Sequence, residues 1–147
     1  MMQPSKGTFE KRNKARMQAP EPATILIVDD EERNRKLLEV FMQAEGYRTI
    51  AVGDGREAVA VAARERPHLI LLDMMMPGMD GFDVARALKG QAELSAIPVI
   101  VVSSLDDIAS RRRVLSAGAD EVVNKPVDRW QLSRHVARLL AAADKER

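Results

Sequence analysis

Short, continuous apolar runs that alternate with helix-forming stretches constrain the fold of this chain more than any other feature. Three runs, at residues 25–28, 68–72 and 99–102, are almost entirely apolar, which is typical of strands buried on both faces of a parallel sheet. Weaker runs at 47–52 and 121–123 fit strands nearer the sheet edges. Helical spacing, caps or helix-ending glycines mark the stretches between them, at 31–45, 55–64, 82–89, 107–116 and from 128 onward.

A strand followed by a helix therefore occurs five times in succession. This order predicts an α/β fold with a five-stranded parallel sheet, and helices should cover both faces because right-handed crossovers are strongly preferred. At 147 residues the chain suits one well-buried domain. We place that domain at residues 23–143 and a short C-terminal tail at 144–147.

The first 22 residues differ from the rest of the chain. Their apolar residues follow no period, and their charges are mainly basic, at Lys6, Lys11, Arg12, Lys14 and Arg16. Such a segment cannot bury enough surface to offset the entropy of ordering it. We expect a flexible basic tail at 1–22, which is either a solvated extension or a docking segment.

Composition excludes several functional classes. A formal net charge of +1 gives no general attraction to nucleic acid or to an anionic membrane. The chain has no cysteine and two histidines, which excludes disulfides, a thiolate nucleophile and a Cys-ligated zinc site and argues against a His-based metal site. No apolar run approaches the roughly 20 residues that span a bilayer. We therefore expect a cytoplasmic protein with no membrane insertion and no direct contact with nucleic acid.

Polar side chains follow four of the five expected strands. Asp29 and Asp30 follow the first, Asp73 the third, Ser103 the fourth and Lys125 the fifth. Ligands of open α/β sheets bind beyond the carboxyl ends of the strands, where the strand order reverses. These side chains should therefore gather at one edge of the sheet.

Three carboxylates at one edge repel one another. Two like charges 4 Å apart cost about 4 kcal/mol at an effective dielectric constant near 20. Lys125 supplies one positive charge and a divalent cation would supply two, which together balance Asp29, Asp30 and Asp73. Oxygen ligands favour Mg²⁺, or Mn²⁺ in its place. The pattern predicts a metal-assisted reaction between a phosphate and a carboxylate nucleophile.

The sequence resembles the receiver domain of bacterial response regulators, over residues 24–142. It is similar above all to receivers that accompany diguanylate cyclase domains or stand alone in cell-cycle control. The resemblance implies a flavodoxin-like (βα)5 fold with strand order 2-1-3-4-5. It rests on four segments, namely Ile25–Asp30, Leu71–Gly81, Ile97–Ser103 and Gly118–Asp120 with Asn124–Pro126.

The resemblance also implies a role for each residue of the site. Asp73 would accept the phosphoryl group. Asp30 would bind Mg²⁺ directly and Asp29 through water, with Asp73 and the main-chain carbonyl of Met75 as further ligands.

Two residues would bind the transferred group. The Ser103 hydroxyl and the Lys125 ammonium would each bind a phosphoryl oxygen, and the Lys125–Pro126 peptide would be cis. Met75 and Leu105 occupy the positions that flank the attacking water during hydrolysis in this family. Both are apolar here, so we expect a long-lived phosphoryl group.

The implied function is that of a two-component response regulator without an output domain in this chain. A histidine kinase or histidine phosphotransfer protein would dock near the first helix and phosphorylate Asp73. The protein would assist its own Mg²⁺-dependent phosphorylation and slow dephosphorylation rather than act on a separate substrate. A downstream protein would bind the face between the fourth and fifth helices, and the protein would be a monomer or a phosphorylation-dependent dimer.

Three residues are candidates for that partner face. Similar receivers often carry an aromatic switch residue at the position of Val122, so switching here would rely on loop and helix shifts. Trp130 lies off the apolar stripe of its helix and is either a partner contact or a cap on the helix start. Arg111 opens a run of three arginines that forms either a solvated face or a site for an acidic partner.

Three other functions compete with this one. A phosphatase of the haloacid dehalogenase type needs a second aspartate two residues after the first, where this chain has Met75. A phosphorylation-independent module of receiver shape usually lacks one of the acidic pair, the acceptor or the lysine, and none is missing here. A DNA-binding regulator would need an output domain, for which no residues remain after position 147 and the 22 residues of the basic tail are too few.

Overall fold

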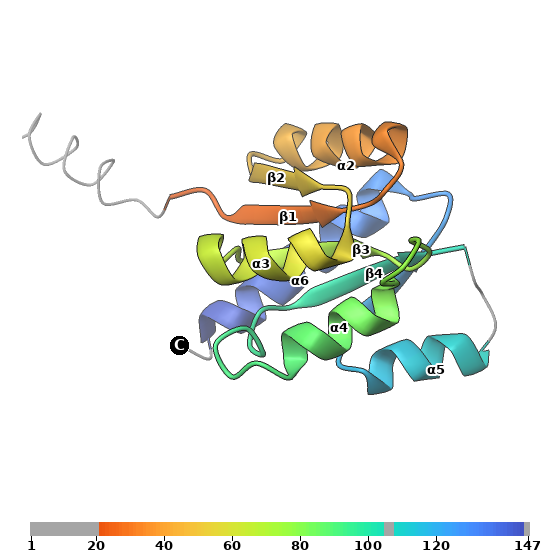
Figure 1. Ribbon diagram of the computed structural model, residues 1–147. Coiled ribbons are helices and arrows are strands. Elements are labelled where there is room, and N and C mark those ends of the chain that lie inside the picture. The colour runs from red at the N-terminus through yellow and green to blue at the C-terminus, as the bar shows by residue number, and fades with distance from the viewer. Residues whose placement is uncertain (1–20, 105–107, 146–147) are drawn as a thin grey trace, which may run out of the picture.

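The computed structural model describes residues 21–104 and 108–145. Strands and helices alternate along these residues as the sequence predicts (Figure 1). The strands are β1 (Thr24–Val28), β2 (Arg48–Val52), β3 (Leu69–Asp73), β4 (Val99–Ser103) and β5 (Glu121–Asn124). The helices are α2 (Glu32–Ala44), α3 (Gly55–Glu65), α4 (Gly81–Lys89), α5 (Ile108–Ser116) and α6 (Arg129–Lys145).

All five strands are parallel and form one sheet in the order β2-β1-β3-β4-β5. This confirms both the α/β class and the strand order implied by the resemblance. The chain moves outward from β1 to β2 and then crosses back to β3, so the order reverses between β1 and β3. In Figure 1 the arrowheads of the strands point to one side, and the polar residues that follow the strands lie there.

Side-chain alternation divides the core into two layers, one on each face of the sheet. Leu26, Ile70 and Val101 pack with buried residues of α3, α4 and α5. Ile25 and Leu71 pack on the other face with buried residues of α2 and α6. Because both faces are covered, β3 and β4 are buried at every position, which explains why their sequences are continuous apolar runs.

Local signals in the sequence set most helix ends. Asp54 accepts hydrogen bonds from two main-chain N–H groups at the start of α3, Asp80 forms a capping box with Asp83 in α4, and Asp128 Oδ1 accepts from Gln131 N in α6. Gly46 and Gly118 follow α2 and α5 with positive φ, a conformation that glycine adopts without strain.

The ordered elements extend slightly beyond the domain boundaries expected from the sequence. Helix α6 continues to Lys145, beyond the boundary expected at residue 143, because its last turns are rich in alanine, the strongest helix former. Most of the expected tail, residues 1–20, lies outside the described residues. Glu21, which belongs to that predicted tail, pairs with Arg48 at the start of β2.

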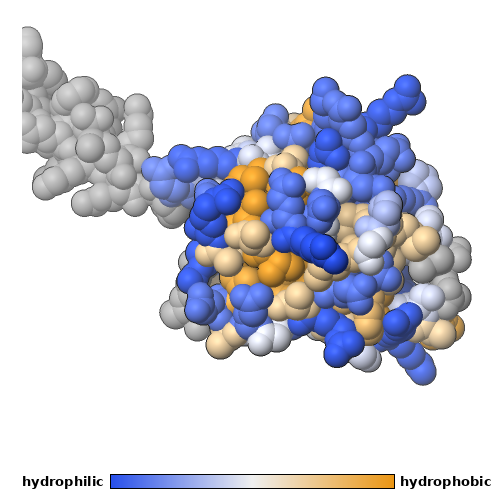
Figure 2. All heavy atoms as spheres, viewed as in Figure 1, coloured by the Kyte–Doolittle hydropathy of each residue, from blue (hydrophilic) through white to orange (hydrophobic). Residues whose placement is uncertain are grey.

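Figure 2 shows the face seen in Figure 1 as mostly hydrophilic, with hydrophobic residues gathered in one area over β1 and α3. Within residues 21–104 and 108–145, none of the helices combines the length and the apolar character that crossing a bilayer requires.

Replacing Leu26 with alanine should destabilise the fold strongly. Leu26 lies in a central strand and is 0% exposed, so Leu26→Ala removes buried apolar surface and leaves a cavity, at a cost of about 2–5 kcal/mol in the free energy of unfolding. The matched control is Leu37→Ala in α2, where the side chain is 48% exposed and the expected loss is under about 0.5 kcal/mol. Urea unfolding followed by circular dichroism measures both, and equal losses would contradict the assignment of the core.

Candidate functional site

The loop after β1 holds the acidic pair. The Asp29 side chain is 1% exposed, and its Oδ1 accepts a hydrogen bond of 2.9 Å from Glu31 N. Asp30 is exposed. The main chain of the loop is fixed on both sides, because Asp29 N donates to Val52 O at 3.1 Å and Arg35 Nη1 donates to Asp29 O at 2.8 Å.

Asp73 ends β3 and is held by an ion pair from across the sheet edge. Lys125 Nζ lies 2.9 Å from Asp73 Oδ1, and the exposed fractions of the two side chains are 28% and 4%. The main-chain N–H of Met75 lowers the pKa of Asp73, in the same sense as Lys125. The hydrogen bond from Lys125 therefore orients Asp73 within the site.

Ser103 and Lys125 are joined through the main chain. Ser103 ends β4, is 3% exposed, and its carbonyl accepts from Lys125 N at 2.8 Å. The Lys125–Pro126 peptide is cis, as expected. Ser103 therefore lies at the same edge of the sheet as Asp73 and Lys125.

Burial makes the charged carboxylates of the site costly. Burial raises the pKa of Asp73 above its ordinary value, although the hydrogen bond and charge of Lys125 act against it. Burial likewise raises the pKa of Asp29, and the negative charge of Asp73 adds to the effect. A positive charge placed among these groups would relieve both costs.

The acidic neighbours of Lys125 determine the direction of its pKa shift. Burial by itself would lower the pKa of its ammonium, but the carboxylates of Asp73, Asp29 and Glu31 outweigh burial, and the pKa of Lys125 is raised. Lys125 is therefore positively charged at neutral pH.

The three carboxylates can hold a divalent cation. One oxygen from each of Asp29, Asp30 and Asp73 lies within 4.8 Å of the others. Asp29 Oδ2 is buried and has no hydrogen-bond partner in the part of the chain that the structure describes. A buried, unpartnered carboxylate oxygen beside two further carboxylates fits a hard cation such as Mg²⁺.

Sequence reasoning missed two residues that shape the site. Arg35 ties α2 to the loop of the acidic pair, and no periodicity or motif pointed to it. A Cβ at Gly81 would come within 2.8 Å of Asp73 O and Met74 Cα. Only glycine lets the start of α4 approach Asp73 so closely; the sequence signal was its place at the end of the Leu71–Gly81 segment, directly after the capping residue Asp80.

The candidate residues for a partner face do not form one exposed surface. Val122 is 5% exposed and belongs to the core beneath α5, so its side chain is not available to a partner, contrary to the expectation. Arg111 is half-buried and bonds to the main chain of Val122. Trp130 is 62% exposed, and the guanidinium of Arg129 lies 4.8 Å from the centre of its ring.

An open depression of about 410 Å³ adjoins the acidic site. Asp29 and Lys125 border it. Its apolar lining comes from α2, from β4 and from the segment between β5 and α6, and consists of Leu37, Leu38, Val102, Pro126 and Val127.

Comparison with known proteins agrees with this geometry. The family model of the response regulator receiver domain matches residues 25–137. The response regulator PleD of Caulobacter vibrioides (strain NA1000 / CB15N) is 45% identical over 117 residues, which cover 80% of this chain and 26% of PleD. The chain spans between about a quarter and a half of the length of the curated relatives that it matches.

Solved structures give the same result. The receiver domain of a signal transduction histidine kinase from Syntrophus aciditrophicus is 42% identical, with a TM-score of 0.76 over 82% of this chain and 91% of that chain. The receiver domain of sensor histidine kinase PA1611 from Pseudomonas aeruginosa PAO1, solved with a magnesium ion coordinated in its active site cleft, is 31% identical. Its TM-score is 0.76 over 82% of this chain and 98% of that chain.

Neutralising Asp29 should have opposite effects with and without Mg²⁺. In EDTA, Asp29→Asn removes a buried negative charge and keeps the oxygen that accepts from Glu31 N, so we expect a stabilisation of about 1 kcal/mol. With Mg²⁺ at about 100 times its Kd, wild type should gain about 2.7 kcal/mol, and Asp29→Asn should gain much less.

Thermal unfolding in EDTA and in MgCl₂ measures both effects. The matched control is Asp144→Asn, at an exposed aspartate of α6, which should behave as wild type in both conditions. An Asp29→Asn protein that gains as much from Mg²⁺ as wild type would contradict the cation site.

Proposed function

The chain belongs to the response regulator receiver domain family, and on that premise we propose that Asp73 accepts a phosphoryl group from a histidine kinase or a histidine phosphotransfer protein. The observation that carries the proposal is the buried Asp73 carboxylate, held 2.9 Å from Lys125 Nζ beside two further carboxylates. This arrangement provides a nucleophile, a fixed positive charge and ligands for a cation at one point.

The transfer follows from the charges of these residues. A carboxylate oxygen of Asp73 attacks phosphorus, an O–P bond forms, and the N–P bond to the donor histidine breaks with its electron pair returning to the imidazole. Lys125 neutralises charge on the phosphoryl oxygens, which is positioning and electrostatic stabilisation rather than covalent chemistry. Mg²⁺, when bound, would add positive charge at the same oxygens. In this proposal Asp29, Asp30, Asp73 and the main-chain carbonyl of Met75 hold it.

Ser103 acts after the transfer. Its hydroxyl binds a phosphoryl oxygen after transfer. Ser103 is 3% exposed, and its carbonyl accepts a hydrogen bond from Lys125 N. A movement of Ser103 toward the phosphoryl group would therefore also shift the ends of β4 and β5. Such a shift would convert a local modification into a change in the populations of two conformations.

The phosphodonor is proposed to dock over the depression beside the site. The depression combines an apolar lining from α2 and from Pro126 and Val127 with direct access to Asp29 and Lys125. A helix of the donor that buried its apolar side here would bring its phosphohistidine toward Asp73. Burial of Leu37, at present 48% exposed, would contribute to that contact.

After phosphoryl transfer, the protein is proposed to signal by binding a downstream protein. The protein acts as a phosphorylation-dependent switch in the cytoplasm, as a monomer or as a dimer that forms on phosphorylation. It contacts a downstream protein through the face between α5 and α6, where Trp130 is exposed. It assists its own phosphorylation and slow dephosphorylation.

Incubation with acetyl phosphate and Mg²⁺ tests the acceptor. Wild type should gain the mass of one phosphoryl group, measured on the intact protein. Asp73→Asn should gain none, because an amide is not a nucleophile at phosphorus. The control Asp144→Asn should be modified as fully as wild type, and modification of Asp73→Asn to the same extent as wild type would refute the assignment.

Phosphoryl lifetime tests the role of the site's apolar rim. Met75 is 58% exposed next to the acceptor, whereas Leu105 lies outside the described residues. Because a thioether cannot orient an attacking water, Met75→Asn should shorten the phosphoryl half-life, by about tenfold if one added hydrogen bond stabilises the transition state by about 1.4 kcal/mol. The decay of the phosphorylated mass after removal of acetyl phosphate measures it, and an unchanged half-life would count against a controlling role for Met75.

A further inference from the structure

Helix α5 is held to the domain by little apolar burial. Val114 is its one buried residue among those that the structure describes, while Ile108 and Leu115 are 70% and 42% exposed. A void of about 10 Å³ remains beneath the helix. It is lined by Met74, Ser103, Ser110, Arg111, Val114 and Val122, so it adjoins the residue after Asp73 and the end of β4.

Two arginines of α5 contact the neighbouring elements. Arg111 Nη2 donates to Val122 O and Arg111 Nη1 to Asn124 Oδ1, both at 3.3 Å. The guanidinium of Arg113 lies 4.1 Å from the ring centre of Phe82 in α4. Arg112, between them, is exposed. Since successive helical residues point about 100° apart, the arginine run spreads over three directions and is not one basic face.

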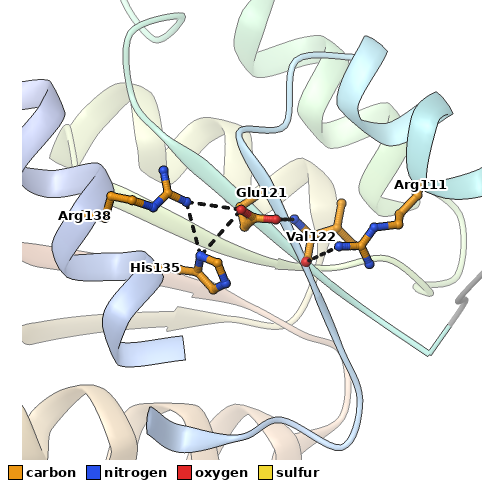
Figure 3. A network of polar contacts seen from close by, with 5 residues as sticks. All are labelled: Arg111, Glu121, Val122, His135 and Arg138. Carbon is orange, nitrogen blue, oxygen red and sulfur yellow. Dashed lines mark hydrogen bonds and ion pairs between the residues drawn. The ribbon is translucent and has the colours of Figure 1, made fainter. Parts of the chain in front are cut away.

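The other side of β5 is fixed independently, from α6. Glu121 Oε1 accepts from Val122 N at 3.0 Å. Glu121 Oε2 lies 3.1 Å from Arg138 Nη2 and 3.5 Å from His135 Nδ1. Figure 3 shows Arg111 reaching Val122 from one side while Glu121, His135 and Arg138 meet on the other.

These contacts hold β5 in place more firmly than they hold α5. Strand β5 is hydrogen-bonded to β4 along its length and is braced from α6 through Glu121. It cannot follow α5 without breaking those bonds. A displacement of α5 away from β5 would therefore strain the Arg111 bonds to Val122 O and Asn124 Oδ1.

We propose that Arg111 is a latch that ties α5 to the main chain of β5 in the unphosphorylated protein, and that phosphorylation of Asp73 releases it. The release step rests on the proposed function. The link between the two sites is short, because Met74 and Ser103 border both the acceptor and the void under α5. Movement of either residue toward a phosphoryl group alters the packing beneath Val114 and Arg111.

Hydrogen exchange of the full chain, without a phosphodonor, tests the latch itself. In Arg111→Gln, the amides of residues 108–116 should exchange about tenfold faster than in wild type, because two hydrogen bonds that hold the helix are lost. The matched control is Arg112→Gln, one residue along the same helix, which should exchange as wild type. Amides of β3 serve as the internal reference.

Two outcomes of this experiment would overturn the latch. One is equal exchange of α5 in Arg111→Gln and Arg112→Gln. The other is faster exchange of β3 and α5 alike in Arg111→Gln, which would make Arg111 a contributor to the stability of the whole domain rather than a tie on one helix.

Exchange after treatment with acetyl phosphate and Mg²⁺ tests the release. In wild type, α5 should exchange faster once the intact mass shows the phosphoryl group, and its rate should approach that of unphosphorylated Arg111→Gln. Phosphorylated Arg111→Gln should gain little more. An equal further gain in both proteins, or no gain in phosphorylated wild type, would overturn the release. If wild type takes up no phosphoryl group, the proposed function fails and the release fails with it, while the comparison without phosphodonor still decides the latch.

Discussion

The ion pair between Asp73 and Lys125 is the interaction on which the candidate site depends. It joins the ends of β3 and β5, which are separated by β4 in the sheet, at a distance of 2.9 Å. Without the ammonium, the buried Asp73 would lie among carboxylates and lose the positive charge that pairs with it, a costly arrangement at low dielectric. The three carboxylates and one ammonium leave two negative charges unbalanced, and the buried Asp29 Oδ2, which has no hydrogen-bond partner within residues 21–104 and 108–145, is suited to bind a divalent cation.

The sheet and its helices divide the molecule into a rigid part and a lightly held part. The central strands are buried on both faces, so the residues at their carboxyl ends are fixed in position, which phosphoryl transfer requires. Helix α5 differs, because arginine contacts rather than apolar burial hold much of it. A rigid site next to a weakly anchored helix is an arrangement in which a small change at one aspartate can alter a surface some distance away.

The geometry of the site does not favour the alternative functions. A phosphatase of the haloacid dehalogenase type would need an acidic group where Met75 stands, and Met75 is an exposed thioether at the rim of the site. A receiver-shaped module that does not use phosphate would have no need to bury an acceptor against Lys125. Position 122 is a valine packed in the core, so it offers neither an aromatic ring nor an exposed side chain for switching.

The sequence by itself was sufficient for the alternation of strands and helices, the burial of both sheet faces, and the acidic residues and lysine at the strand ends. These features depend on local periodicity and on the rule that parallel strands end at the same edge. Tertiary structure alone decided that Asp73 touches Lys125 across 52 positions of chain, that Arg35 and Gly81 shape the site, and that Val122 is buried. It also decided that Arg111 bonds to β5 while its neighbours in the sequence point elsewhere. Such contacts depend on how each helix lies on the sheet and on the conformation of each long side chain, and neither quantity is encoded in the period or composition of a local segment.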